Sequence, residues 1–231
     1  MENRVRRLAD DDFRLMPVLT VPDAAFYLDV PKSTLYSWIS GRHHLVTYHR
    51  QFGRRRPSVP FIGLAEAYAI TAFKQKGVRM QRIWPALERL RDKMGIEHAL
   101  ASRRLHTDGA EILWEMSERD DYLAPIRDLV VVRNEQVVFV DAVRDYLECI
   151  AYDNEDWATS LRLRRFGEVP VVVDPHRAFG RPLIEDRGGV RVEDVLDLWD
   201  AGERPRAIAH GLGLSTRVVQ SVIGSAGRLA A

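Results

Sequence analysis

The side chains best suited to binding a charged ligand lie between Val30 and Ala65. This stretch holds six lysines and arginines and no aspartate or glutamate. Positive side chains without neighbouring carboxylates neutralise phosphates, so the expected chemistry is binding to a nucleic acid backbone. Serine, threonine and tyrosine side chains in the same stretch can contact phosphates or base edges. The candidate contact residues are Lys32, Ser33, Thr34, Tyr36, Ser37, Arg42, Arg54, Arg55 and Arg56.

Patterns for catalysis and metal binding are weaker. His43, His44 and His49 cluster, but a zinc site needs four well-spaced ligands and no cysteine lies nearby. The acidic residues from Asp108 to Asp156 follow no nuclease motif, and we interpret them as a solvated or partner-binding surface. The chain has no phosphate-binding glycine loop, nucleophile elbow or H-E-x-x-H motif. We therefore predict no catalytic residue, no metal and no cofactor.

The composition is that of a globular protein of 231 residues with a net charge of +1. This small total conceals the basic block and an acidic block, which has fourteen acids and four arginines from Asp108 to Asp156. No apolar run is long enough for a bilayer, and the N-terminus lacks the apolar core of a signal peptide. The single cysteine, Cys149, excludes an internal disulfide. We expect a cytoplasmic protein without membrane contact.

Two short helices joined by a tight turn must position the polar residues. Thr20, followed by an early proline and an early acid, is typical of a helix start. Pro31 restricts the preceding residue to extended angles and so helps to end this first helix. A second helix is predicted over Lys32–Ile39, with Leu35 and Trp38 on its inner face. This is the layout of a helix-turn-helix, whose second helix can lie in a DNA major groove.

A β-hairpin is expected after the second helix, which Gly41 ends. Residues 45–49 and 58–62 have strand composition, and the arginine-rich segment 50–56 lies between them. A hairpin in this position is a wing, whose arginines reach phosphates or the minor groove. The alternative is a solvated loop with incidental charge.

Two longer helices are expected over residues 64–76 and 79–94, because both segments have an apolar period near 3.6. Pro85 predicts either a kink in the second of them or a later start. The order of helix-turn-helix, wing and helices resembles the winged-helix domain of MerR-type regulators.

The middle of the chain mixes short strand and helix patterns, which indicates an α+β connecting region. The valine-rich runs at 129–132 and 136–139 are typical of a hairpin, and the alternation over 159–166 is typical of a strand. The further expected elements are strands at 103–106 and 112–114 and a helix at 142–149.

A second helix-turn-helix pattern lies near the C-terminus. A strand at 171–175 and a second strand ending at Ile184 precede a helix over 192–199. A helix over 205–210 and a last helix capped by Ser215 follow. The candidates for a second DNA or partner contact are Arg204, Thr216, Arg217 and Gln220.

This C-terminal segment resembles the small antitoxin-type domain of bacterial toxin–antitoxin operons. The motifs that carry the resemblance are Val173-Asp-Pro175, Phe179-Gly-Arg-Pro-Leu-Ile184, Val192-Glu-Asp-Val-Leu-Asp-Leu198, Ala201-Gly-Glu203, Ala207-Ile-Ala209 and Leu214-Ser215. The loop at 185–189 is longer than the family pattern. With the N-terminal winged domain, the whole chain is similar to VapB-like antitoxins of actinobacteria. The resemblance implies a protein that represses its own operon and neutralises a cognate PIN-like ribonuclease toxin.

The predicted fold is α+β, with a winged helix-turn-helix domain at 15–100, a mixed region at 101–166 and an antitoxin-type domain at 167–225. A homodimer on operator DNA is expected, because paired helix-turn-helices read half-sites. The second unit either reads DNA or mediates dimer or toxin contacts, and its balanced charge favours protein contacts. One alternative function is a MerR-like regulator with a small-molecule pocket in the acidic middle, and another is a metal-dependent nuclease.

Overall fold

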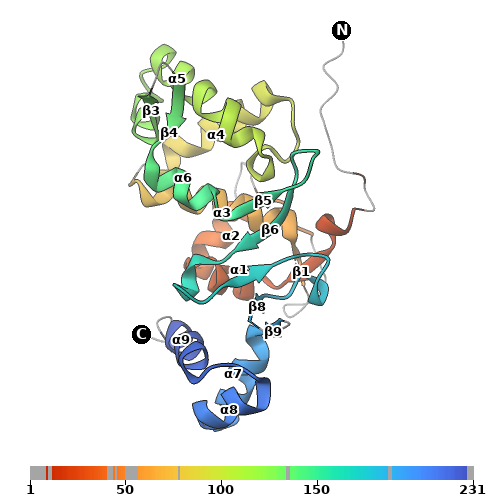
Figure 1. The fold of residues 1–231 in the computed structure, drawn as a ribbon. Helices are drawn as coiled ribbons and strands as arrows, with labels where there is room; N and C mark the ends of the chain where they lie inside the picture. The colour runs from red at the N-terminus through yellow and green to blue at the C-terminus, as the bar shows by residue number, and fades with distance from the viewer. Residues whose placement is uncertain are drawn as a thin grey trace. The chain divides into compact units, whose positions relative to one another are not determined.

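The computed structural model describes residues 9, 12–40, 44, 46–49, 57–77, 79–133, 136–186 and 189–227. The chain divides into two units, Met1–Thr159 and Ser160–Ala231. Helices and strands are mixed in both units, which confirms the α+β fold class (Figure 1). The predicted three-part division, with boundaries near residues 100 and 166, stays a prediction.

The N-terminal unit is built around helix α3 (Phe61–Gln75), in which every residue from Phe61 to Phe73 is buried. A helix that is buried on all sides forms the centre of a domain, and the other elements pack around it. The elements of this unit are, in chain order, η1 (Phe13–Leu15), β1 (Pro17–Leu19), α1 (Val21–Tyr27), α2 (Lys32–Ser40), β2 (Val59–Pro60), α3, α4 (Met80–Met94), η2 (Ala99–Ala101), η3 (Leu105–Gly109), α5 (Ala110–Arg119), η4 (Ala124–Leu129), β3 (Val130–Arg133), β4 (Gln136–Phe139), α6 (Asp141–Leu147) and β5 (Ile150–Tyr152).

The first helix-turn-helix forms as predicted. Thr20 caps α1, because its Oγ1 accepts a hydrogen bond from the backbone N–H of Asp23 at 3.2 Å. Asp29 makes the turn in the left-handed region, with φ of 56°. Helix α2 covers the predicted range and adds Ser40, while Gly41, the expected stop, lies outside the described residues.

Helix α4 passes through Pro85 without a break, so the predicted later start is wrong. A proline inside a helix leaves the carbonyl four residues earlier without its N–H partner. That carbonyl belongs to Gln81, and it accepts a hydrogen bond from the hydroxyl of Tyr122 at 3.2 Å. The guanidinium of Arg82 lies 3.8 Å from the centre of the Tyr122 ring and holds the ring in place. A side chain from outside the helix thus replaces the missing hydrogen bond.

The first strand predicted for the wing is wrong where the structure describes it, and of the second only Val59–Pro60 forms a strand. Residues 46–49 are not in a strand, and residues 61 and 62 already belong to α3. Strand β2 pairs with β1 instead, with Leu19 opposite Val59. Prolines at positions 57 and 60 have no N–H to donate, so this segment cannot extend a ladder. Among the described residues of the expected hairpin, the N–H of His49 donates to the carbonyl of Ser58 at 2.8 Å and so joins its two sides.

Two further strand predictions are also wrong. The segment at 103–114 is helical, with η3 running into α5, so neither predicted strand exists. The buried residues Leu105, Leu113 and Met116 of η3 and α5 recur at helical spacing. This period extends over more residues than either of the short predicted strands contains. The strand predicted over 159–166 is β6 (Ala158–Arg162), and a 3₁₀ turn, η5 (Arg164–Phe166), replaces its end.

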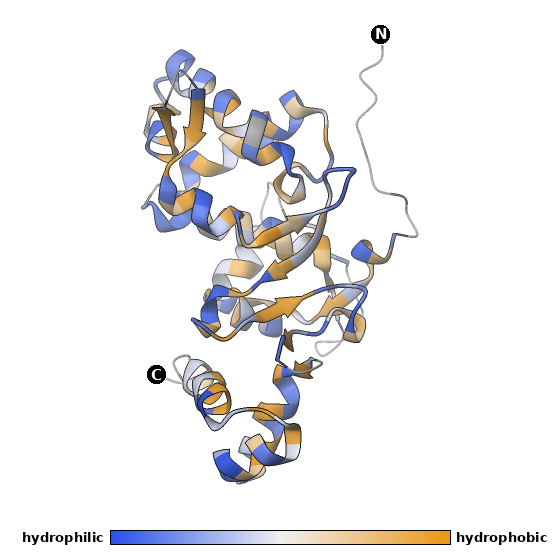
Figure 2. Cartoon of the chain, viewed as in Figure 1, coloured by the Kyte–Doolittle hydropathy of each residue, from blue (hydrophilic) through white to orange (hydrophobic). Residues whose placement is uncertain are grey.

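The hairpin predicted in the middle of the chain is confirmed. Strands β3 and β4 pair antiparallel, with Val130 opposite Phe139 and Arg133 opposite Gln136. Both strands are strongly hydrophobic (Figure 2). The predicted helix that follows them is α6, which buries Val143 and Leu147.

The C-terminal unit is a small antiparallel sheet followed by three helices. Strand β6 starts in the N-terminal unit beside β5 and ends here, where Leu161 pairs with Val173 of β7. The predicted strand pair is confirmed as β7 and β8, and β9 adds an unexpected third partner. The elements after η5 are β7 (Val171–Val173), η6 (Ala178–Gly180), β8 (Leu183–Ile184), β9 (Val190–Arg191), α7 (Val192–Asp200), α8 (Pro205–Leu212) and α9 (Thr216–Gly227).

Candidate nucleic-acid interface

Helix α2 presents a polar face, because its apolar residues all turn inward. Leu35, Trp38 and Ile39 are buried, with exposed fractions of 0%, 1% and 4%. The burial of these three side chains fixes the rotation of the helix about its axis. The residues on the opposite side are Lys32, Ser33, Tyr36 and Ser37, which are exposed, and Thr34, which is half-buried.

The hydroxyl groups on this face differ in what they can offer a ligand. Ser37 donates its hydrogen to the carbonyl of Thr34 at 2.6 Å, and Ser40 donates to the carbonyl of Tyr36 at 2.7 Å. These two serines therefore remain as acceptors. Lys32 and the half-exposed phenol of Tyr36 remain as donors to phosphate oxygens. Ser40 was missed by the sequence reasoning, although it follows Tyr36 at helical spacing.

The charge of this face is entirely positive within α2, since Lys32 is its one ionisable side chain besides Tyr36. Arg42, Arg54, Arg55 and Arg56 lie outside the described residues, so their contribution stays a prediction. His49 and Ser58 mark where segment 50–56 leaves and rejoins the described chain, joined by the hydrogen bond given above.

The second helix-turn-helix has the geometry expected from its sequence. Gly213 ends α8 in the left-handed region, with φ of 69°. The hydroxyl oxygen of Ser215 accepts a hydrogen bond from the N–H of Val218 at 3.2 Å and caps α9. The buried Val219 and Val222 turn the other side of α9 outward. Among the predicted contact residues, Arg204, Arg217 and Gln220 are exposed and Thr216 is half-buried.

The chain has clear relatives among known proteins. Residues 17–87 match a family model described as "Putative DNA-binding HTH domain". A curated relative from Mycobacterium tuberculosis, named "Putative antitoxin VapB45", is 38% identical over 216 residues, which cover 87% of this chain and 90% of the relative. This chain belongs to the VapB-like antitoxin family. The crystal structure of Rv2018 from the same organism superimposes with a TM-score of 0.79 at 38% identity, covering 90% of this chain and 98% of that one.

The second helix-turn-helix of this antitoxin differs from the first in its surrounding charges, because acids as well as arginines lie near it. In the C-terminal unit, Arg181 pairs with Glu193 at 2.7 Å and Arg191 pairs with Asp194 at 2.6 Å. Within the described part of the chain, three exposed arginines near the second turn have no ion pair, and they are Arg204, Arg206 and Arg217. Arg206, in the first turn of α8, was not among the residues predicted from the sequence.

The acidic residues of this antitoxin are spread over separate ion pairs. Asp120 pairs with Arg89 at 2.7 Å, and Asp153 pairs with the buried Arg14 at 2.6 Å. No group of three or more acids, histidines or cysteines among the residues that the structure describes could hold a metal ion. The relative named as an antitoxin and the match to a DNA-binding family model point to a regulator.

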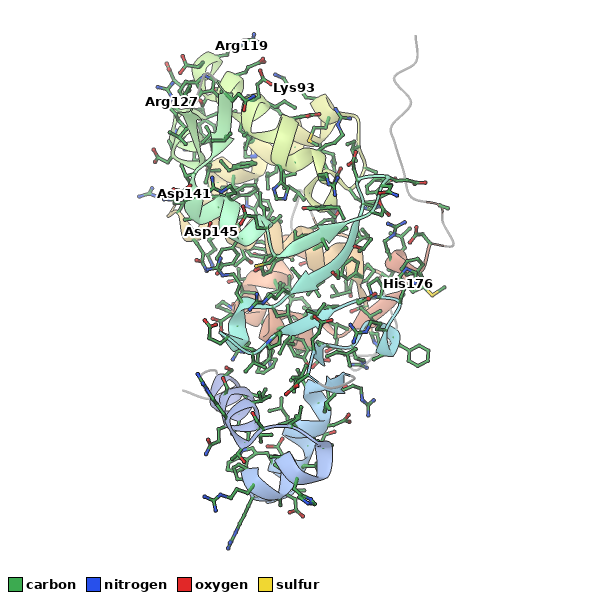
Figure 3. All side chains as sticks on the ribbon, viewed as in Figure 1. Lys93, Arg119, Arg127, Asp141, Asp145 and His176 are labelled. Atoms are coloured by element: carbon green, nitrogen blue, oxygen red, sulfur yellow. The ribbon has the colours of Figure 1, made fainter. Side chains whose placement is uncertain are left out.

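Exposed charges on α4 and α5 are also arranged in ion pairs. Lys93 of α4 and Arg119 of α5 lie 3.4 and 3.8 Å from the carboxylate of Glu115, and they appear near each other in Figure 3. Asp141 and Asp145 lie on the exposed side of α6. Exposed pairs of this kind contribute little to stability.

Two aromatic side chains of the antitoxin are exposed in the C-terminal unit. Phe179 is 92% exposed, and Trp199 is 42% exposed. Phe179 also lies in the left-handed region, with φ of 54°, directly after Ala178 at 46°. Two such residues in a row are strained. The exposed ring on this strained backbone makes Phe179 a candidate contact residue.

None of the helices in the part of the chain that the structure describes has the length and apolar character needed to cross a membrane.

Proposed function

We propose that this antitoxin binds operator DNA as a homodimer, represses its own operon in the cytoplasm and neutralises a cognate PIN-like ribonuclease toxin. The observation that carries the proposal is the 38% identity, over nearly the whole chain, to a relative named as an antitoxin. The exposed face of α2 supports the DNA part, because it combines donors and acceptors without an acid. The exposed Phe179 supports a protein partner for the C-terminal unit.

The DNA part is tested with the DNA upstream of the gene. Lys32→Ala and Tyr36→Ala are compared with Arg217→Ala and Gln220→Ala in gel-shift titrations at fixed salt. We expect the α2 pair to lose about tenfold or more in affinity, as for lost phosphate and base contacts. The α9 pair is the matched control on the other helix-turn-helix. If only the α9 variants lose affinity, the second unit reads the operator and our assignment of α2 is wrong.

The toxin part is tested with the product of the adjacent open reading frame. Co-expression with this chain should relieve the growth arrest that the toxin alone causes, and the α2 variants should relieve it equally well. Purified antitoxin should not cleave RNA with added metal, whereas the neighbour should. Light scattering of the free chain measures the proposed homodimer directly.

The same neighbour separates this proposal from a MerR-like regulator that responds to a small molecule. A transporter or metabolic enzyme that does not bind the chain would favour that regulator. The sequence predicts the effector pocket of such a regulator in the acidic middle, whereas a pocket of the structure lies beside α2.

A further inference from the structure

A pocket of about 750 Å³ lies within the N-terminal unit at the C-terminal end of α2. This volume is in the range of sites for small molecules. It is formed by residues that are far apart in sequence and come from α2, α3 and α4 and from the segments that follow α2 and α4. Its polar lining consists of Ser40, Thr47, Tyr48, Glu66, Arg91 and His98, together with His44 and Glu97.

Three of these groups form a buried network. Nδ1 of His98 lies 2.9 Å from Oε1 of Glu66 and 3.1 Å from Oγ1 of Thr47. The other carboxylate oxygen of Glu66 accepts the N–H of Thr47 at 2.6 Å. Both oxygens of Glu66 are therefore used, and the imidazole is held in one orientation. Its second nitrogen, Nε2, is left without a hydrogen bond among the described residues.

His98 is positively charged over a wider pH range than an ordinary histidine. Burial lowers its pKa, but the hydrogen bond and the charge of Glu66 outweigh burial and raise the pKa. Glu97 adds to this rise and Arg91 opposes it, so both lie within electrostatic reach of the ring. A protonated His98 carries an N–H at Nε2 as well as at Nδ1, and the residue is part of the pocket lining.

Arg91 supplies a second donor from α4. Its side chain is half-buried and lines the same pocket. Within the described part of the chain, Arg91 has no carboxylate partner, unlike Arg89 two residues earlier, which pairs with Asp120. An arginine that is kept at a pocket wall without a partner is suited to a planar carboxylate or a phosphate.

We propose that this pocket binds a small molecule through an anionic group, a carboxylate or a phosphate, which Arg91 and the Nε2 side of His98 hold together. The apolar wall formed by Ile39, Leu87 and Leu100 would contact the remainder of the molecule. Glu66 acts as a positioning residue. It orients His98, and both of its carboxylate oxygens are already used in hydrogen bonds within the protein.

The location of the pocket connects it to DNA binding. Ser40 is the last residue of α2, and Thr47 lies in the segment that leads toward the arginines at 50–56. An anion here places negative charge beside the helix that meets DNA phosphates. Binding of the anion and of DNA should therefore oppose each other, and the opposition is reciprocal. This last step rests on the proposed function of α2, whereas binding of the anion does not.

Anion binding is tested first, without DNA. Inorganic phosphate and succinate are titrated into the full chain at constant ionic strength, and Tm is followed. At ten times the Kd, Tm should rise by about 3 °C. Arg91→Gln should abolish the rise, and because Arg91 makes no ion pair within the described residues this variant should fold. Arg79→Gln is the matched control, since this exposed residue precedes the same helix, lies outside the pocket lining and has no ion pair among the described residues.

A second readout covers His98 itself. His98→Gln identifies the ring resonances of His98 in the NMR spectrum, and these resonances should move with anion in the wild type and in Arg79→Gln. An equal rise of Tm in the wild type and in Arg91→Gln would mean general stabilisation by excluded anions and would overturn the proposal. Unmoved His98 resonances at saturating phosphate and succinate would overturn it as well.

The connection to DNA is measured last, by operator gel shift with and without saturating anion. A fall in affinity of about threefold or more in the wild type, absent in Arg91→Gln, supports the opposition between the two sites. If the anion binds but operator affinity is unchanged, the anion site is supported and its effect on DNA binding is contradicted. Loss of operator binding altogether would contradict the proposed function instead, so the two failures are distinguishable.

Discussion

Nδ1 of His98 lies 2.9 Å from a carboxylate oxygen of Glu66, although the two residues are 32 positions apart in the chain. Both are almost inaccessible to water, with exposed fractions of 7% and 3%. Removing one member of a buried ionic pair leaves the other without a partner, which costs about 3 kcal/mol or more. The same carboxylate holds Thr47, so this pair fastens the segment after α2 to the core helix α3.

The stability of the N-terminal unit should depend on pH in two opposite ways. The pKa of His98 is raised, so its contribution is complete below pH ~6.5, the unfolded value, and is lost as pH rises through the folded pKa. Burial, and to a lesser extent Arg103, lower the pKa of His106 to about 4. The contribution of His106 is therefore lost as pH falls from about 6.5 toward 4. We expect maximal stability near pH ~6.5, measured by urea unfolding at a series of pH values.

Two variants test which histidine controls the acid side and which controls the alkaline side of this pH profile of stability. His98→Gln should flatten the alkaline side alone, and His106→Gln should flatten the acid side alone. His106 is bonded to the hydroxyl of Tyr152 at 2.9 Å, so glutamine can keep part of that contact. A pH profile that neither variant changes would show that other groups control it.

Gly63 should tolerate no side chain. A Cβ at this position would lie 2.1 Å from the carbonyl oxygen of Thr47, and a backbone atom held through Glu66 cannot move away. We expect Gly63→Ala to cost about 3 kcal/mol of unfolding free energy, at the upper end of overpacking effects. Gly211→Ala is the control, because its Cβ meets nothing within 4 Å and alanine favours a helix by about 0.5–1 kcal/mol. Equal effects of the two changes would contradict this account.

Phe179 should matter for a partner and not for the fold. Phe179→Gly removes an exposed ring and relieves a left-handed backbone, so the C-terminal unit should gain about 1 kcal/mol. Affinity for the toxin should nevertheless fall about 30-fold, as for an aromatic anchor. Ala178→Gly is the control, since it relieves a similar backbone while it keeps the ring. Calorimetric titration measures the toxin affinity of both variants, and thermal unfolding measures their stability. If Phe179→Gly leaves the toxin affinity intact, Phe179 does not contact the toxin.

The arginines at 54–56 should act as phosphate contacts that do not read sequence. Changing Arg54, Arg55 and Arg56 to alanine should weaken binding to operator and to unrelated DNA alike. The slope of log affinity against log salt should become shallower by about 2 to 3, since each phosphate contact contributes ~0.9. Gel-shift titrations over a salt series provide the slope. An unchanged slope would exclude segment 50–56 from the DNA contact.

Tyr122 should stabilise α4 only because Pro85 is present. Tyr122→Phe removes the hydroxyl that bonds the carbonyl of Gln81, and the expected loss is about 1 kcal/mol. Pro85→Ala supplies an N–H within the helix for that carbonyl, so Tyr122→Phe should then cost much less. A double-mutant cycle with thermal unfolding measures the difference. Additive effects would show that the hydroxyl and the proline act independently.

Elements with strong local signals were predictable from the sequence. Thr20 and Ser215 cap the helices that they were expected to cap, and the buried sides of α2 and α9 follow from helical periodicity. Local signals are sufficient there, because caps and periodicity act within one or two turns. The β3–β4 hairpin was predictable for the same reason, as its two runs are neighbours in sequence.

The features that depend on distant residues were not predictable. The pairing of β2 with β1 brings Val59 beside Leu19, and no local pattern shows that. The Glu66–His98 pair looks like two unrelated residues, one inside an alanine-rich helix and one before a short turn. The segment at 103–114 was misjudged because Asp108 and Gly109 suggest a turn, whereas the chain continues there as a helix.

The boundary between the two units falls inside strand β6, between Thr159 and Ser160. A fragment starting at residue 167, the predicted boundary of the C-terminal domain, would lack β6 and so leave β7 as an open edge. The row Val171–Val173 is then free to pair with the same row of another copy, which is a route to aggregation. Fragments meant to isolate this unit should therefore begin before Ala158.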